Sequence, residues 1–288
     1  MKKTSIIYLI GLLFVLTNET NGQNQNYGTN DTAGHYLDVG DAKIYYEVYG
    51  EGKPVLLLHG GMFGYINEYE KYIPVLSKNY KVIAIATRGH GKSELGEKEL
   101  SYDLFAEDVS KILKKESDEK ALIVGFSDGA IISFLFAANY PDLTDKVVAL
   151  AGGFGSDWFH KPALNSMKGL TGEGLEKSYP GFVSSRKKLM PQPERWNEFI
   201  AELNKVNMQP VFITDEAAKL IRSPVLVIGG DRDQYFRIDN FTHVHQTLPN
   251  SQLAIIPQCG HVDLFSKQWV FEDIISTFLA EETPKTTH

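Results

Sequence analysis

The sequence predicts an α/β fold built on a mostly parallel sheet, and three observations support this prediction. Short continuous runs of Val, Ile, Leu and Ala recur along the chain, as is typical of strands covered on both faces. Helical patterns separate these runs, and strands that alternate with helices form parallel sheets through right-handed crossovers. The length of 288 residues allows one large domain, or a core domain that carries an insertion.

The expected strands follow one another in a regular order. Residues 42–49 alternate between apolar and polar side chains, which indicates a half-exposed strand. The continuous apolar runs are residues 54–58, 81–86, 121–125, 146–151 and 224–228, and a further apolar run covers 253–256. Between them, residues 101–115 carry one apolar helical stripe after a polar start at Ser101, and residues 127–139 form a buried helix that ends before Pro141.

The strand pattern stops in the middle of the chain, where a helical insertion is expected. Its clearest helix is amphipathic and covers residues 193–206. The apolar stripe of this helix consists of Trp196, Phe199, Ile200 and Leu203. Small-molecule sites are mostly apolar, so we expect this insertion to cap the core and to line a substrate pocket, with Trp158 among the pocket residues.

The amino terminus has the pattern of a secretory signal peptide. Lys2 and Lys3 precede an apolar run at residues 6–16, and a polar segment follows. The run is shorter than the ~20 residues that span a bilayer core, so we expect export to the periplasm or the medium and no stable membrane span. The expected division of the chain is a signal peptide at 1–22, a polar linker at 23–36, a core of 37–155 and 223–280, a helical cap at 156–222, and a polar tail at 281–288.

Composition argues against several classes of partner and cofactor. Lys and Arg total 29 against 36 Asp and Glu, and this net charge of −7 makes nucleic acid an unfavourable partner. Cys259 is the only cysteine, which excludes an internal disulfide and a thiolate-rich metal site. His243 and His245 are two residues apart in an expected helix and therefore point apart. We expect neither a metal ion nor another cofactor.

One short motif carries the expected chemistry. Gly125-Phe126-Ser127-Asp128-Gly129 follows a buried strand and opens a helix, which is the context of a nucleophile elbow. The two glycines suit a sharp turn at which neighbouring chain passes close by. Ser127 is therefore the expected nucleophile, and a serine that only caps the helix is the alternative.

Two later segments supply the partners that a catalytic serine needs. Asp231 and Asp233 follow the strand at 224–228, and His261 follows the run at 253–256, so these side chains leave the same edge of the sheet. A serine hydroxyl needs a base within hydrogen-bond reach, and the base needs a carboxylate that fixes its tautomer. The order serine, acid, histidine meets both needs.

These motifs resemble the α/β-hydrolase fold superfamily, in its serine hydrolase form with a helical cap, from about residue 43 to residue 279. The resemblance implies an eight-stranded, mostly parallel sheet with helices on both faces. It implies that Asp233 is the catalytic acid, because the family's acid stands three residues after the strand-ending glycine, here Gly230; Asp231 is the alternative.

The resemblance also implies an oxyanion hole and a second family segment. His59-Gly60-Gly61 resembles the family's oxyanion loop, so the backbone N–H groups of Gly61 or Met62, together with that of Asp128, are expected to bind the oxyanion. His59 is expected to brace this loop rather than to transfer protons. The segment that starts at Arg88 resembles the family's R-G-x-G-x-S, but Ala86 stands where an Asp is usual, which puts a family ion pair in doubt.

Asp128 has two possible side-chain roles. An acid in the first turn of a helix is favoured by the helix dipole. Its place directly after the serine also resembles the valacyclovir-hydrolase-like branch, in which the acid at this position engages the α-amino group of an amino-acid ester. The expected substrate-binding residues are Asp128, Phe126 and Trp158.

The expected function is a cofactor-independent serine hydrolase that cleaves a carboxylic ester or related acyl compound through an acyl-enzyme. The same triad serves α-amino-acid ester hydrolases, aminopeptidase-like amidases, lactonases and carbon–carbon bond hydrolases, so it does not name the substrate. An alternative of another class is a non-catalytic secreted binding protein on a hydrolase scaffold. The expected partner is a small molecule, and the sequence carries no signal of oligomeric state.

Overall fold

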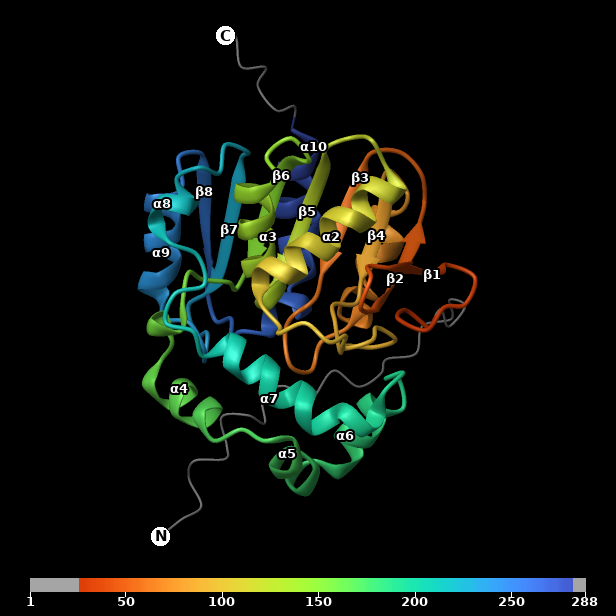
Figure 1. The fold of residues 1–288 in the computed structure, drawn as a ribbon. Helices are drawn as coiled ribbons and strands as arrows, with labels where there is room; N and C mark the ends of the chain where they lie inside the picture. The colour runs from red at the N-terminus through yellow and green to blue at the C-terminus, as the bar shows by residue number, and fades with distance from the viewer. Residues whose placement is uncertain (1–25, 282–288) are drawn as a thin grey trace.

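An eight-stranded sheet forms the centre of the molecule (Figure 1). The computed structural model describes residues 26–281, so the predicted signal peptide lies outside the described residues. The strand order is β1-β2-β4-β3-β5-β6-β7-β8, with antiparallel pairing of β1 to β2 and of β2 to β4 and parallel pairing elsewhere. The predicted mostly parallel sheet of eight strands is confirmed.

The strands coincide closely with the predicted apolar runs. They are β1 (Gly34–Asp38), β2 (Lys43–Tyr49), β3 (Pro54–Leu58), β4 (Lys81–Ile85), β5 (Ala121–Phe126), β6 (Thr144–Leu150), β7 (Val225–Gly230) and β8 (Ser251–Ile256). Every residue of β3, β5 and β7 is buried, as expected for strands in the middle of a sheet that is covered on both faces.

One strand was not predicted. β1 begins within the segment assigned to a polar linker at 23–36. It is an edge strand paired only to β2, and three of its five residues are Gly, His or Asp, so it lacks the apolar run that marks a buried strand.

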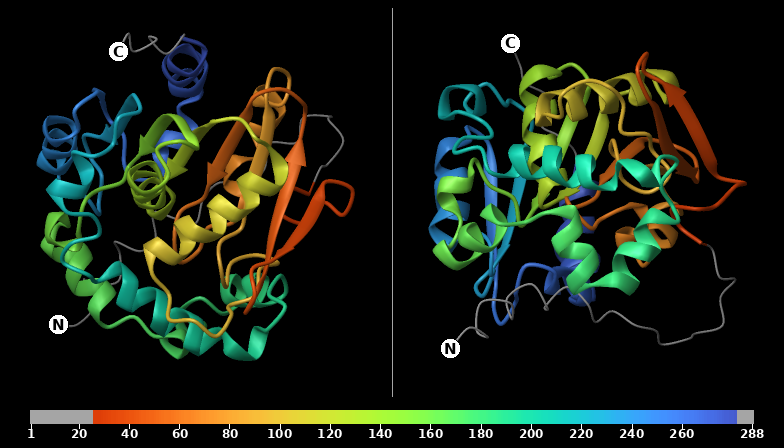
Figure 2. Two further views of the ribbon diagram at one scale, coloured as in Figure 1. Left: turned by 45° about the horizontal axis from the view of Figure 1, so that its top comes forward. Right: turned by 60° about the horizontal axis from the view of Figure 1, so that its bottom comes forward.

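Helices cover both faces of the sheet (Figure 2). One face packs against α2 (Tyr102–Glu116), α3 (Asp128–Asn139) and α9 (Ile238–Thr247). The other face packs against α1 (Ile73–Leu76), the π-helical turn η6 (Val270–Ile275) and α10 (Ser276–Ala280). Ser101 caps α2 as predicted, because its hydroxyl accepts the N–H of Leu104 at 3.1 Å. Within residues 26–281, no helix combines the length and the apolar character that crossing a bilayer requires.

The inserted segment is helical, and most of it lies at one end of the sheet, whereas its last helix lies beside α9 (Figures 1 and 2). It contains η3 (Ser156–Trp158), α4 (Lys161–Lys168), α5 (Gly172–Ser178), α6 (Pro180–Lys187), η4 (Pro193–Arg195), α7 (Trp196–Asn207) and α8 (Asp215–Ala218). The predicted stripe of α7 is buried throughout. Phe199 of this stripe packs edge-on against His90 of the core at 4.9 Å, so α7 joins the insertion to the sheet.

Arg88 is fully buried in the loop after β4 and has two carboxylate partners. Its guanidinium contacts Asp41 at 2.7 Å and Asp108 at 2.6 Å. Arg88 is therefore paired although position 86 is not an Asp. Its partners are Asp41, in the turn before β2, and Asp108, in α2. A buried charge needs such partners, since desolvation alone would cost several kcal/mol.

Candidate active site

Ser127 stands at a strained turn between β5 and α3. Its backbone angles are φ 52° and ψ −114°, a conformation that side-chain-bearing residues rarely adopt. A Cβ on Gly125 would lie 2.2 Å from the Gly129 carbonyl oxygen, and a Cβ on Gly129 would lie 1.9 Å from the Leu58 carbonyl oxygen. Only glycine fits at both positions, so the two glycines of the motif are explained by contact with neighbouring chain.

The structure brings Ser127, His261 and Asp233 into one hydrogen-bonded chain. His261 Nε2 lies 3.0 Å from Ser127 Oγ, and His261 Nδ1 lies 2.8 Å from Asp233 Oδ2. A carboxylate can only accept, so Nδ1 carries the proton and Nε2 accepts from the serine hydroxyl. His261 and Asp233 are each 5% exposed, and the backbone N–H groups of Tyr235 and Phe236 donate to Asp233 Oδ1.

Asp231 lies apart from this chain. Its carboxylate is exposed and accepts the backbone N–H of Cys259 at 3.1 Å, which lowers its pKa. It therefore shapes the loop after β8, while Asp233 contacts the histidine. Asp263 accepts the N–H of Gly260 at 2.8 Å and begins the short helix η5 (Asp263–Ser266), as expected for a residue at a helix start.

The loop after β3 lies against the turn at Ser127. A Cβ on Gly61 would lie 1.9 Å from Asp128 Oδ2, so loop and turn are in contact. The N–H of Asp128 belongs to the first turn of α3, where helix geometry provides no partner within the helix. The predicted donors Gly61, Met62 and Asp128 thus lie on adjoining segments beside Ser127.

His59 braces this loop, as predicted. Its Nε2 accepts the backbone N–H of Thr87 at 3.1 Å, so its Nδ1 carries the proton and donates to the Gly60 carbonyl at 2.6 Å. Burial lowers the pKa of His59 to about 4, which keeps the ring neutral in this arrangement.

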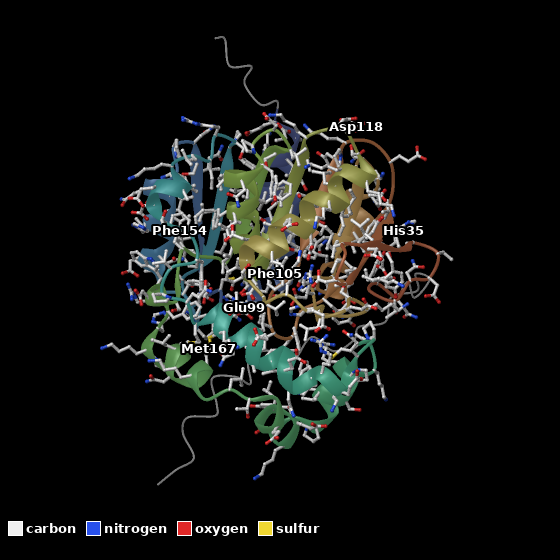
Figure 3. All side chains as sticks on the ribbon, viewed as in Figure 1. His35, Glu99, Phe105, Asp118, Phe154 and Met167 are labelled. Atoms are coloured by element: carbon white, nitrogen blue, oxygen red, sulfur yellow. The ribbon has the colours of Figure 1, made fainter. Side chains whose placement is uncertain are left out.

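A pocket of about 740 Å³, including its open mouth, adjoins Ser127. The core contributes Gly60, Gly61, Met62, Phe63, Glu68, Phe126, Asp128, Tyr235, Phe236, His261 and Val262, and the helical insertion contributes Phe159, Ser166, Met167, Leu170 and Asn207. Met167 extends from α4, which lies below the sheet in Figure 3. Glu68 and Asp128 are the carboxylates of this lining, and no Lys or Arg belongs to the set.

Two of the three predicted substrate-binding residues line this pocket. Phe126 and Asp128 belong to the lining, whereas Trp158 does not. The Trp158 ring stacks on His243 at 4.6 Å, and the Arg237 guanidinium covers it at 5.3 Å. The short helix that carries Trp158 directs the indole ring toward α9. The prediction that Trp158 lines the pocket is therefore wrong.

Asp128 presents a carboxylate oxygen that has no hydrogen-bond partner. The residue is 9% exposed, and its Oδ2 is buried and unpaired. Burial raises the pKa of Asp128 to about 6 from its usual 3.8, and the nearby Tyr102, His261 and Asn207 offset part of this rise. An unpaired buried carboxylate costs free energy that a cationic ligand would recover.

Some pocket residues carried no signal in the sequence. Glu68 lies in the short helix η2 (Ile66–Tyr69), and Asn207 ends α7. The Asn207 Oδ1 accepts the Tyr102 hydroxyl at 2.8 Å, which links the insertion to α2. These residues reach the pocket through tertiary packing, and no local motif marks them.

Metal-ligand geometry is not found within residues 26–281, where no three His, Cys, Asp or Glu side chains gather closely enough to hold an ion. His243 Nε2 contacts Asp215 at 3.0 Å, and His245 Nδ1 contacts the Ser251 hydroxyl at 2.9 Å. The two histidines thus point to different partners, as predicted from their spacing.

Comparisons with known proteins agree with this architecture. A family model described as alpha/beta hydrolase fold matches residues 53–189. A 2-hydroxy-6-oxo-6-phenylhexa-2,4-dienoate hydrolase from Burkholderia cepacia is 26% identical over 257 residues, which cover 80% of this chain and 89% of that protein.

Two solved structures show the same fold. The carboxylesterase CesB of Bacillus subtilis has a TM-score of 0.70 at 21% identity, and the match covers 87% of this chain and 92% of that one. The enol-lactonase of Burkholderia xenovorans LB400 has a TM-score of 0.67 at 17% identity, with 86% and 100% covered. At such identities the likeness establishes the fold, and the three relatives carry different chemistries.

The raised pKa of Asp128 makes a prediction about stability. Between pH 3.8 and pH 6 the folded protein holds a proton that the unfolded chain releases, so Asp128 lowers the free energy of unfolding as pH rises through this window. The Asp128→Asn variant has no carboxyl group at this position, so its free energy of unfolding does not fall for this reason as pH rises. We expect the variant to gain about 3 kcal/mol of stability relative to the parent between pH 4 and pH 7.

Urea unfolding of both proteins across that pH range measures this difference. Asp118→Asn, which removes an exposed carboxylate just after the end of α2, is the matched control. A difference between Asp128→Asn and the parent that stays constant with pH would contradict the raised pKa.

Proposed function

Because the chain belongs to the α/β-hydrolase fold superfamily, we propose that it is a serine hydrolase that cleaves a carboxylic ester or related acyl compound through an acyl-enzyme. The observation that carries the proposal is the hydrogen-bonded chain from Ser127 through His261 to Asp233. A non-catalytic binding protein would have no need of a strained serine whose hydroxyl contacts a histidine nitrogen.

The proposed reaction has two halves. Ser127 Oγ attacks the acyl carbon, its proton passes to His261 Nε2, and the carbonyl oxygen becomes an oxyanion bound by the N–H of Asp128 and that of Gly61 or Met62. His261 then gives the proton to the leaving alcohol as the bond to it breaks. Water repeats these steps on the acyl-serine and releases the acid. Asp233 stabilises the imidazolium that forms in each half.

The charges of the pocket favour neutral or cationic substrates. Glu68 and Asp128 are the carboxylates in the lining, and no Lys or Arg belongs to it. A dienoate, which the Burkholderia cepacia relative hydrolyses by its name, carries a carboxylate that these side chains would repel. Esters, lactones and amides without an anionic group fit this pocket better than such carbon–carbon bond substrates.

A second candidate is an ester or amide of an α-amino acid, hydrolysed by the same triad. The unpaired Oδ2 of Asp128 supports it, because an ammonium group would supply the missing partner directly beside the nucleophile. The proposed partner is therefore a small molecule in both cases.

We also propose that the protein is exported through its amino-terminal signal peptide, to the periplasm or the medium. The basic start and the 11-residue apolar run at 6–16 support this proposal. Expression of the whole chain in a bacterial host should yield a secreted or periplasmic protein whose mass corresponds to cleavage near residue 22. A cytoplasmic product that retains Met1 would contradict it.

Substitution of the triad tests the proposed function. We expect Ser127→Ala and His261→Ala each to lower kcat by about 10⁴- to 10⁶-fold, because members of a triad act as one unit. Asp233→Asn should cost about 10⁴-fold, whereas Asp231→Asn should cost little, since Asp231 does not contact His261. The measurements are kcat on the best chromogenic ester and the Tm of each variant. Near-parent turnover by Ser127→Ala, or a larger loss in Asp231→Asn, would refute the assignment.

Asp128→Asn tests the second candidate, because it keeps the backbone N–H and removes the charge. At pH 7 we expect KM for α-amino esters to rise by about 10- to 100-fold, as an ion pair shielded from water is lost. KM for aliphatic esters of the same length should change less than about threefold. Equal changes for both ester series would assign Asp128 to the helix start alone.

A further inference from the structure

Glu68 lies beneath the loop that carries the proposed oxyanion donors. It belongs to η2, which is anchored by Tyr69, whose hydroxyl contacts the carbonyl oxygens of Leu58 at 3.0 Å and Val124 at 3.2 Å. These carbonyls lie at or near the ends of β3 and β5. The anchoring directs the neighbouring Glu68 side chain to the pocket, where its Oε2 accepts the backbone N–H of Gly60 at 2.8 Å.

Gly60 is therefore held on both sides. Glu68 accepts its N–H, and the protonated Nδ1 of His59 donates to its carbonyl at 2.6 Å. His59 is itself fixed by the N–H of Thr87. The two contacts determine the orientation of the peptide groups on each side of Gly60, and the predicted donors Gly61 and Met62 follow directly.

The loop needs such support because part of it is strained. Met62 has φ 57°, a left-handed conformation that is unfavourable for a residue with a side chain. Strain of this kind persists only where the surroundings over-determine the backbone. A Cβ on Gly64 would lie 2.2 Å from the Gly60 carbonyl oxygen and 2.9 Å from Glu68 Oε1, so the loop folds back tightly around the Glu68–Gly60 contact.

We propose that Glu68 is a positioning residue of the oxyanion loop, which acts by accepting the N–H of Gly60 and so aims the next N–H groups at the substrate's developing oxyanion. The proposal rests on acyl transfer at Ser127. It assigns to Glu68 a role that depends on side-chain length and on an acceptor oxygen, and not on charge. Burial raises the pKa of Glu68 to about 7, and a carboxylate and a carboxylic acid can both accept this N–H.

Three substitutions separate length, acceptor and charge. Glu68→Gln keeps the length and an acceptor oxygen but removes the charge. Glu68→Asp keeps the charge but withdraws the carboxylate by one methylene. Glu68→Met keeps the length and removes the acceptor. Glu70→Met, at the exposed residue that follows η2, is the matched control.

The first readout is the rate at which a fluorophosphonate labels Ser127, in which the Oγ–P bond forms and the P–F bond breaks. We expect the labelling rate and kcat to fall by about 10- to 100-fold in Glu68→Asp and Glu68→Met, while KM stays within about threefold of the parent value. The reason is that a misplaced N–H donor weakens the stabilisation of the transition state but does not weaken binding of the substrate in its ground state. Glu68→Gln should stay within about threefold of the parent, and Glu70→Met should match it.

Parent rates in Glu68→Asp would overturn the proposal, and so would a loss in Glu68→Gln as large as that in Glu68→Asp, which would assign the effect to charge. If Glu68→Met does not fold, the Gln and Asp variants decide. A parent that is not labelled would refute the proposed function instead. In that case hydrogen exchange at residues 59–64 tests the positioning role alone: Glu68→Asp should exchange at least tenfold faster there than Glu68→Gln, and equal rates would refute it.

Discussion

The left-handed backbone at Ser127 is the constraint on which the site depends. It costs free energy, and it persists because β5 and α3 are buried on either side of the turn and because Gly125 and Gly129 let neighbouring chain pass in contact. One turn thereby performs three tasks: it directs the hydroxyl to His261, places the N–H of Asp128 beside the same point, and presses the Asp128 side chain against the loop after β3. A relaxed helix start would separate these groups.

Backbone groups and side chains have different functions in the proposed site. No Lys or Arg lines the pocket, so developing negative charge on the substrate must be met by N–H groups, whose aim depends on the loop from His59 to Gly64. The side chains that remain are apolar or carry carboxylates. Asp128 thus affects which substrate binds, and Glu68 acts through the backbone of the oxyanion loop, which determines how the substrate reacts.

Burial explains which features could be predicted from the sequence. Strands covered on both faces leave continuous apolar runs, whereas the edge strand Gly34–Asp38 leaves none and was assigned to a linker. Ser127 follows from a motif whose glycines have a steric cause. Glu68 and Asn207 could not be predicted, because their distance from the nucleophile is set by how η2 and the helical insertion pack. Trp158 was expected in the pocket from its aromatic character, but it stacks on His243, and sequence alone does not specify ring direction.

The proposed mechanism requires that Ser127 becomes acylated during turnover. Rapid acid quenching of the parent protein with a slowly hydrolysed ester, followed by mass spectrometry of its peptides, tests this directly. We expect an added acyl mass on the peptide that contains Ser127, formed at the start of turnover and lost as substrate is exhausted. Turnover with no adduct on that peptide, or with the acyl group on another residue, would contradict it.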